Sequence, residues 1–193
     1  QEFDAGLPDF LGGLDSKDIK GSRAAAGSGG DFFKSVTNIA RVQSLPASMT
    51  LMLKGSMQFS SKSLVYAEQF NIGGPTTVRG YPLSEYTGDN GITATSELYI
   101  PPYFVSKDIK VPYTKTNLYD ATRFVGFFDW GYTHNRVPQP GEHRNRSISA
   151  IGAGIRFDIP NLNSTSLDLG YGLGVKPSDK HRLQVYISTK MFF

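Results

Sequence analysis

The sequence contains no cysteine, which excludes disulfide bonds and thiolate metal sites. Charged residues make up 19% of the 193 residues, below the roughly 25% of ordinary soluble domains. Long apolar runs are missing too. None approaches the roughly 18 residues of a membrane helix, so any membrane span has to consist of strands. The net charge of +3 is small and its basic residues are dispersed, so we expect no nucleic-acid partner.

Histidine is scarce, and none of the three residues, His134, His143 and His181, lies in a hydrolase or zinc-protease motif. Each falls in a polar connecting segment, where solvation is a sufficient reason for a histidine. Paired histidine spacing is absent as well, so nothing favours a metal site. We therefore expect no catalytic residues, no metal and no cofactor, and interpret the chain as a protein that is not an enzyme.

Strand periodicity is what the sequence does contain, together with abundant glycine (21 residues) and aromatic residues (12%). The clearest alternation lies near the C-terminus, where Leu183, Val185 and Ile187 alternate with polar residues. Segments of about ten residues match a tilted strand that crosses the hydrocarbon layer. We predict seven or eight strands, the first of them weak. Their ranges are residues 32–42, 50–59, 92–100, 124–132, 151–159, 166–175 and 183–193, with the end of a further strand within residues 1–20.

Alternation alone fits two all-β folds, a transmembrane antiparallel β-barrel and a soluble β-sandwich whose apolar faces point inward. Aromatic residues gather near predicted strand ends, as in Phe32-Phe33 and Tyr103-Phe104, where a membrane barrel carries its interfacial girdles. The chain also ends on an aromatic strand at Phe193, a liability in a soluble protein but an assembly signal in an outer-membrane barrel. We therefore favour the barrel.

The predicted connections alternate in character along the chain. Four are long and glycine-rich or charged, as expected for outer loops: residues 21–31, 60–90, 134–146 and 176–182. The segments 43–48 and 160–164 are tight turns of the kind found at the periplasmic end. The connection at residues 101–117 is an exception, because it is long for a periplasmic turn and the sequence offers no physical reason for its length.

A single arginine, Arg79, lies between glycines in the long polar break at residues 60–90. A cation on such a loop needs an anionic partner, and the best candidate is Asp129, a lone acid among aromatic residues on a predicted strand. Strand parity places Asp129 on the face opposite Phe124, Phe128 and Trp130, and places Glu97 on the inward face of its own strand. The pairing of Arg79 with Asp129 is our central hypothesis about the site.

In order and spacing, these motifs resemble the C-terminal barrel region of the outer-membrane-protein-85 superfamily. The resemblance is greatest to the two-partner secretion transporters of the haemolysin-activator type, and it extends over roughly residues 30–193. The matching pieces are Glu68-Gln69-Phe70, Gly73-Gly74, Val78-Arg79-Gly80-Tyr81, Gly88-Asp89 leading to Glu97-Leu98, Phe127-x-Asp129-x-Gly131, Gly152-x-Gly154-x-Arg156 and the terminal Phe193.

The resemblance implies a sixteen-stranded barrel preceded by periplasmic domains, with the long loop at residues 61–88 folded back into the lumen. Residues 1–193 would then form the C-terminal part of one barrel domain, its last seven or eight strands, with the periplasmic domains absent from this chain. A start at Gln1 without methionine suits a processed or trimmed protein. Size bears on completeness independently, because eight closed strands leave no room for a loop of about thirty residues. Either the loop stays outside or strands are missing, and the bare face of Gly170, Gly172 and Gly174 favours missing strands.

The resemblance also assigns roles to residues. Arg79, within the motif of Val78, Arg79, Gly80 and Tyr81, would pair with Asp129, which Phe127 and Gly131 flank on the barrel wall. Gly73, Gly74 and Gly80 would let the loop turn tightly and approach the wall, since residues with a Cβ resist both. Glu97 would help to orient the arginine, and Phe193 would be the signal for barrel assembly.

The function implied is the secretion of an unfolded client, a haemolysin or adhesin type of protein, across the bacterial outer membrane. The implied partners are that client, outer-membrane lipid and the barrel-assembly machinery during insertion. Two relatives within the superfamily remain open, a barrel-assembly insertase and a transporter fused to a patatin-like passenger, because they share the Val-Arg-Gly-Tyr loop. A passive porin is the alternative of another class, and bilayer conductance that persists without residues 61–88 would favour it.

Overall fold

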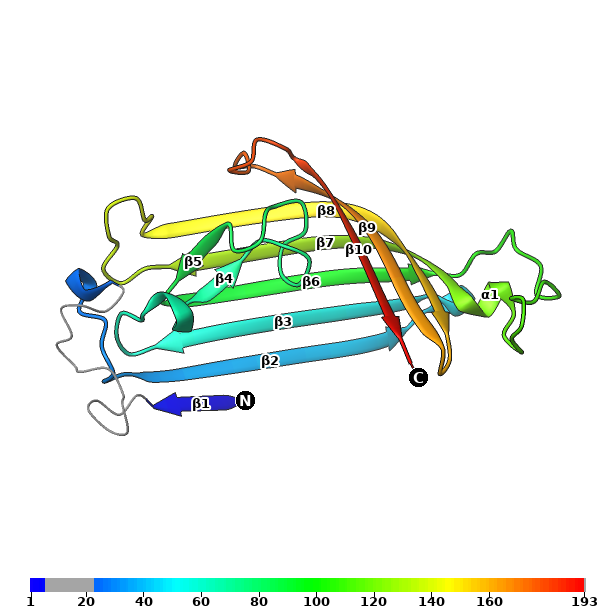
Figure 1. Cartoon of the computed structure of the whole chain (residues 1–193), viewed down its shortest axis with the longest axis horizontal. Helices are drawn as coiled ribbons and strands as arrows, with labels where there is room; N and C mark the ends of the chain where they lie inside the picture. Colours follow the sequence, from blue (N-terminus) through cyan, green and yellow to red (C-terminus); the bar gives the residue numbers. More distant parts are fainter. Residues whose placement is uncertain (6–22, 193) are drawn as a thin grey trace.

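The computed structural model describes residues 1–5 and 23–192 and consists mainly of one curved antiparallel sheet (Figure 1). Its eight strands follow the order β1-β2-β3-β6-β7-β8-β9-β10, and β4 and β5 form a separate pair. The main strands are β1 (Glu2–Ala5), β2 (Phe33–Ser44), β3 (Thr50–Ser60), β6 (Asn90–Ile100), β7 (Thr122–His134), β8 (Asn145–Ile159), β9 (Asn163–Leu173) and β10 (Leu183–Met191). The remaining elements are η1 (Ala24–Ala26), η2 (Pro46–Ser48), η3 (Tyr66–Glu68), β4 (Phe70–Ile72), β5 (Tyr86–Gly88) and α1 (Leu118–Ala121).

All seven predicted strands are present, and the weak first strand is β1. The largest difference in length concerns β8, which begins at Asn145 rather than at residue 151. Its polar first residues continue the backbone ladder with β7, where Asn145 pairs with His134 and Ser147 with Tyr132. Periodicity misses such residues because the hydrogen bonds of a strand do not require apolar side chains. Phe193 and most of the predicted range 1–20 lie outside the described residues.

The two faces of the sheet differ in polarity as a membrane barrel requires. Outward-facing Leu169, Val185 and Ile187 are 45%, 56% and 75% exposed, so the apolar face is uncovered. The inner face, toward which β9 and β10 curl, carries glycine and polar residues. The sandwich alternative is therefore wrong, because no second sheet of the described chain covers the apolar face.

The sheet does not close on itself within the described residues, because β1 and β10 are its two edges and do not pair with each other. The segment between β3 and β6 lies against the inner face, with β4 beside β6 and β7, and β5 beside β7 (Figure 1). A closed barrel of eight strands would have no room for this loop. The described sheet is open, so the loop can lie against its inner face.

The main hydrophobic cluster lies between the long loop and the inner face rather than beneath the outer face. Its loop residues are Ile72, Val78 and Tyr81, and its wall residues are Ile148 and Ala150 of β8, all at most 2% exposed. Burial of these apolar side chains fixes the loop against the strands. The loop is consequently part of the folded structure and not a solvated connection.

The long connection between β6 and β7, residues 101–117, projects beyond the end of the sheet (Figure 1). Its first residues are fixed to the neighbouring turn η2, since the Tyr103 hydroxyl donates to the carbonyl oxygen of Ala47 at 2.6 Å. The ring of Phe104 contacts that of Phe124, with 5.8 Å between their centroids. No helix among the described residues is long and apolar enough to cross a membrane.

Candidate functional site

Tight glycine turns direct the long loop back toward the strand wall. Gly73 and Gly74 have φ angles of 108° and 97°, a region that favours glycine. A Cβ at Gly74 would lie 2.9 Å from a methyl carbon of Leu83, so the turn also lacks space for a side chain. The backbone N–H of Gly73 donates to the Thr77 hydroxyl at 2.9 Å. These contacts hold the turn that precedes Arg79.

The loop tip touches the wall backbone to backbone at Gly80. This residue has a φ of 90°, and a Cβ on it would lie 2.6 Å from the backbone nitrogen of Gly172. A Cβ on Gly170 would in turn lie 2.7 Å from the nitrogen of Gly80. Glycine on both surfaces is therefore what permits the approach.

Two tyrosines fasten the same tip to the last strands. The carbonyl oxygens of Leu173 and Val175 share the single hydrogen of the Tyr81 hydroxyl, the Val175 oxygen at 2.9 Å. The Tyr186 hydroxyl of β10 accepts from the Gly80 N–H at 3.2 Å and donates to the Tyr81 carbonyl oxygen at 2.9 Å. We did not single out Tyr186 from the sequence, although its parity on the last strand marks it as inward-facing.

Arg79 binds Asp129 through both arms of its guanidinium. Its Nε donates to Oδ2 at 2.7 Å and its Nη2 to Oδ1 at 2.9 Å, and its backbone N–H donates to Oδ2 at 3.1 Å. Nη1 donates to Oε1 of Glu97 at 2.7 Å. The guanidinium carbon lies 3.4 Å from the ring centroid of Phe127, a cation–π contact. We call Arg79, Asp129, Glu97 and Phe127 the clasp.

The clasp is buried, which strengthens its electrostatic coupling. The side chain of Asp129 is fully buried and that of Arg79 is 5% exposed. Burial by itself would lower the pKa of Arg79, but the hydrogen bonds and charges of Asp129 and Glu97 outweigh burial and raise it. At about 4 Å and an effective dielectric of 20, the gross attraction of one pair is roughly 4 kcal/mol, and desolvation removes much of it. Such a contact can position the loop and still yield.

Further charges on the inner face extend this network. Asp168 lies 3.6 Å from Nη1 of Arg79 and accepts two hydrogen bonds from Arg156, at 2.7 and 3.0 Å. Lys54 lies 3.5 Å from Glu97. Sequence reasoning left Asp168 without a role and used Arg156 only as a motif residue. Counting along the strands could have identified both residues. Arg156 on β8 and Asp168 on β9 face inward on two paired strands, as Asp129 does on β7.

Glycines of the wall motifs make room for the clasp and the loop. A Cβ at Gly131 would lie 2.9 Å from Val78 and 3.0 Å from Ile72, so its absence admits the buried loop side chains. A Cβ at Gly152 would overlap the ring of Phe127. Phe127 therefore lies over Gly152 with its face toward Arg79. The structure thus brings together all the predicted site residues except Phe193, which lies outside the described residues.

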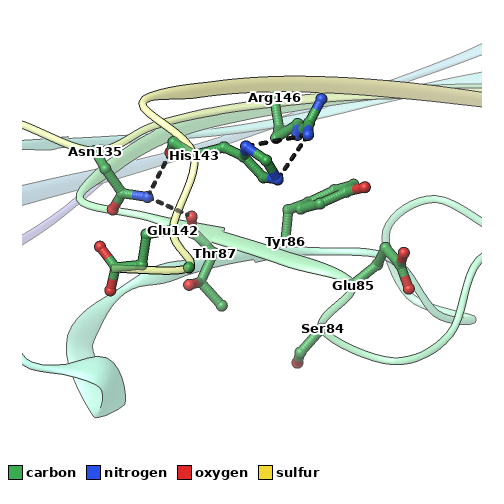
Figure 2. Close-up of a pocket in the computed structure, with 9 residues that line it drawn as sticks. Ser84, Glu85, Tyr86, Thr87, Asn135, Glu142, His143 and Arg146 are labelled. Atoms are coloured by element: carbon green, nitrogen blue, oxygen red, sulfur yellow. Dashed lines mark hydrogen bonds between the residues drawn. The ribbon is translucent and has the colours of Figure 1, made fainter. Parts of the chain in front are cut away.

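A second feature is a cavity of about 220 Å³ at the outer end, between β5 and the connection from β7 to β8 (Figure 2). The Asn135 amide donates to the carbonyl oxygens of Thr87 and His143 and joins the two sides. The Arg146 guanidinium lies 5.3 Å from the ring centroid of Tyr86. Among the described residues no group of histidine and acidic side chains is arranged to hold a metal ion.

A comparison with models of known protein families assigns the chain to one of them. The model of the family "haemolysin secretion/activation protein ShlB/FhaC/HecB" matches residues 18–157, which is more than half of the chain. This chain belongs to the ShlB/FhaC/HecB family. Its membership and its sheet together make it an outer-membrane β-barrel protein. A comparison with curated proteins gave no match.

Solved structures with the same fold include two CdiB proteins and one BamA. CdiB from Escherichia coli is 23% identical with a TM-score of 0.71, and the match covers 97% of this chain and 32% of that one. CdiB from Acinetobacter baumannii is 21% identical with a TM-score of 0.56, covering 82% and 26%. BamA from Haemophilus ducreyi lacking POTRA domains 1–3 is 15% identical with a TM-score of 0.56, covering 82% and 35%. The sheet of this ShlB/FhaC/HecB family member thus matches about a third of a larger barrel protein.

Proposed function

We propose that this chain is the C-terminal part of a two-partner secretion transporter, which moves an unfolded client protein across the outer membrane. Residues 1–193 would belong to one barrel domain whose lumen is the inner face of the sheet. The family match supports secretion. The observation that supports the mechanism is the buried ion pair of Arg79 with Asp129 in the clasp. The clasp holds the loop in the position that client passage requires.

The contacts of the loop suggest how the clasp acts. A groove of about 600 Å³ lies between the loop tip and the last strands, lined by Pro75 and Thr76 on one side and by Ser166, Asp168, Val185, Tyr186, Ile187 and Ser188 on the other. Hydroxyl and carboxylate groups suit the solvated backbone of an extended polypeptide, which has no core of its own to bury. A shift of the tip would change the width of this groove, so the position of Arg79 would set the space available to the client.

The proposed partners follow from the two faces of the sheet. Lipid of the outer membrane would cover the apolar outer face, and the client, a haemolysin or adhesin type of protein, would pass along the inner face. The barrel-assembly machinery would recognise the terminal strand with Phe193. Transport by this route requires no cofactor, because folding of the client outside the cell can bias its movement outward.

Barrel assembly is the second candidate function, and the likeness to the fold of BamA is the observation that favours it. An insertase would use the open edge of a sheet to pair with the strands of a new barrel. The family match favours secretion over this role. The amounts of other outer-membrane barrels in a strain lacking this protein distinguish the two, because only an insertase affects barrels other than itself.

Charge reversal tests the proposed role of the clasp. We expect Arg79→Asp and Asp129→Arg each to reduce secretion of the cognate client at least about tenfold, since each leaves a buried charge without its partner. The combined reversal should recover part of the loss. Secretion by the double variant no better than by either single variant, with equal folded protein in the membrane, would show that direct pairing is not the mechanism.

Asp129→Asn provides a milder version of the same test. It keeps the shape of the side chain and removes its charge, so the hydrogen bonds from Arg79 weaken without a change in volume. Arg144→Lys is the matched control, because Arg144 is an exposed outer-loop arginine that donates to the carbonyl oxygen of Arg136. We expect normal secretion from the control and reduced secretion from Asp129→Asn.

A further inference from the structure

A second buried ion cluster lies at the outer end of the sheet and shares no residue with the clasp. Its central pair is Arg23 and Asp89, whose side chains are both fully buried at 2.6 Å. Neither residue was assigned a role from the sequence. The side chains and backbone groups that meet there belong to Arg23, Leu64, Gln69, Asp89, Asn135 and Glu142, which we call the neck cluster.

Arg23 uses its whole guanidinium in this cluster. Nε and Nη2 donate to the two carboxylate oxygens of Glu142 at 2.8 and 2.9 Å. Nη1 donates to Asp89 at 2.6 Å and to the carbonyl oxygen of Leu64 at 2.7 Å, and Nη2 also donates to Asn135 at 3.2 Å. Lysine offers three donors from one point, so it cannot reproduce these directions.

Asp89 joins the two ends of the long loop. Its Oδ1 accepts from the Leu64 N–H at 2.8 Å and from the Gln69 amide at 3.3 Å, both near the start of the loop. Its Oδ2 accepts from the Arg136 N–H at 2.8 Å, in the connection after β7. Asp89 itself immediately precedes β6. The start of the loop, its end and a neighbouring outer connection are therefore fixed at one carboxylate.

The backbone of Arg23 indicates that its position is enforced. Its φ is 64°, in the left-handed region that non-glycine residues seldom adopt. Such a conformation persists only where the surroundings determine it. Here the buried contacts of the Arg23 side chain fix its backbone. They hold the segment before β2 against the neck of the loop, where the loop starts at Leu64 and ends at Asp89.

Two motifs of the sequence gain a physical reason from this cluster. Gln69 of Glu68-Gln69-Phe70 donates to Asn135 at 2.9 Å and to Asp89. Asp89 of Gly88-Asp89 is the central acceptor. Both motifs thus belong to the outer neck of the loop, whereas Arg79 belongs to its inner tip.

We propose that Arg23 and Asp89 are positioning residues that hold the neck closed and thereby determine where Arg79 meets Asp129. The segment between residues 70 and 88 leaves this anchor and returns to it, so the neck limits the positions that the tip can reach. When the contact between Arg23 and Asp89 is broken, the loop tip moves more freely, and Arg79 spends less time paired with Asp129. This inference concerns the position of the loop and holds whichever client the protein transports.

Spin labels on the tip and the wall measure this positioning directly. The chain has no cysteine, so Thr76→Cys and Ser188→Cys are its only labelling sites and lie on opposite sides of the same groove; any cysteine elsewhere in the full protein is first replaced by serine. The full protein in its membrane gives dipolar broadening of the spectrum while the tip remains at the wall. We expect Asp89→Asn and Arg23→Lys to lose most of that broadening, as Arg79→Ala should.

Lys62→Met is the matched control. Lys62 pairs with Asp31 between the same two outer segments, but both side chains are more than half exposed, so this pair should contribute little. The control should retain the broadening. Unchanged broadening in folded Asp89→Asn and Arg23→Lys, together with its loss in Arg79→Ala, would overturn the proposal.

Folding is measured separately by the resistance of the barrel to unfolding by heat. If the two neck variants do not fold, Asp89→Glu is measured in their place, since it keeps the charge but displaces the carboxylate from Arg23 and from the Leu64 and Arg136 N–H groups. Loss of broadening in the folded variant supports the positioning role, and full broadening overturns it. Secretion does not enter this measurement, so a wrong proposal about function would not alter its outcome.

Discussion

Individual residues of the loop tip show how chemistry and space act together. Arg79 needs a planar guanidinium because its partners lie in several directions: two oxygens of Asp129, one of Glu97 and the face of Phe127. Gly80 needs to lack a Cβ because it meets the backbone of Gly172. The charge contact and the close approach depend on each other, since neither forms unless the tip reaches the wall.

Gly170→Ala tests the close approach. The added methyl group would lie 2.7 Å from the nitrogen of Gly80 and 3.0 Å from the Cβ of Arg79, so the tip has to move. Overpacking of this kind costs about 1–3 kcal/mol. We expect a lower thermal unfolding midpoint and reduced secretion. Gly126→Ala is the control, because a Cβ there meets nothing within 4 Å, and a similar loss in both variants would contradict the explanation.

At the scale of elements, the outer connections are joined to one another by polar contacts. The connection between β7 and β8 meets the segment before β2 through Glu142 and Arg23. Glu85 of the long loop accepts from the backbone N–H and hydroxyl of Ser178, in the connection between β9 and β10. The outer end is therefore a set of mutually fixed loops, and its order depends on a few carboxylates.

Acid should loosen this end of the protein. Burial raises the pKa of Glu142, but hydrogen bonds from Arg23, the Gln139 N–H and Tyr66 outweigh burial and lower it below its ordinary 4.5. A carboxylate with a lowered pKa stabilises the folded loops above its ordinary pKa, and this stabilisation disappears as the pH falls through the lowered value. Amide hydrogen exchange in the outer loops should therefore accelerate below about pH 4.5.

Glu142→Gln is the comparison for this measurement. Its side chain cannot titrate, so exchange in the same loops should be faster at neutral pH and should change less on acidification. An equal acceleration by acid in both proteins, after correction for the intrinsic pH dependence of exchange, would show that another group controls the outer loops.

At the scale of the whole molecule, the sheet is a wall with an apolar outer face and a polar inner face. This distribution is the reverse of a soluble domain and requires lipid on the outside. Its edges, β1 and β10, do not pair with each other. Unpaired backbone groups in hydrocarbon cost several kcal/mol each, so in the membrane these edges require further strands.

Paired arginine substitutions test the two faces. Leu169→Arg places a charge on the outer face, which should cost about 2–4 kcal/mol near the middle of the bilayer. Ser188→Arg places the same charge beside the inner groove, where water can solvate it, and should cost much less. Equilibrium unfolding in lipid vesicles measures both. Equal destabilisation would contradict the assignment of the faces.

The sequence by itself predicted the main strands, their parity and the pairing of Arg79 with Asp129. Alternation fixes which side chains share a face, so inward positions for Asp129 and Glu97 followed from counting along β7 and β6. Motif order then indicated the family. The three-residue strands β4 and β5 escaped prediction because so short a segment carries no readable period, and Tyr186 did because parity cannot say which inward residue the loop will touch.

Only the tertiary structure decided how loop and wall fit together. The neck cluster joins residues separated by up to 119 positions, and no local pattern connects Arg23 with Glu142. The structure also decided that the apolar face is the outer one and that the described sheet is open, because periodicity is identical for either face and for either closure. Contacts distant along the chain depend on the curvature of the whole sheet, which is a property of all its strands together.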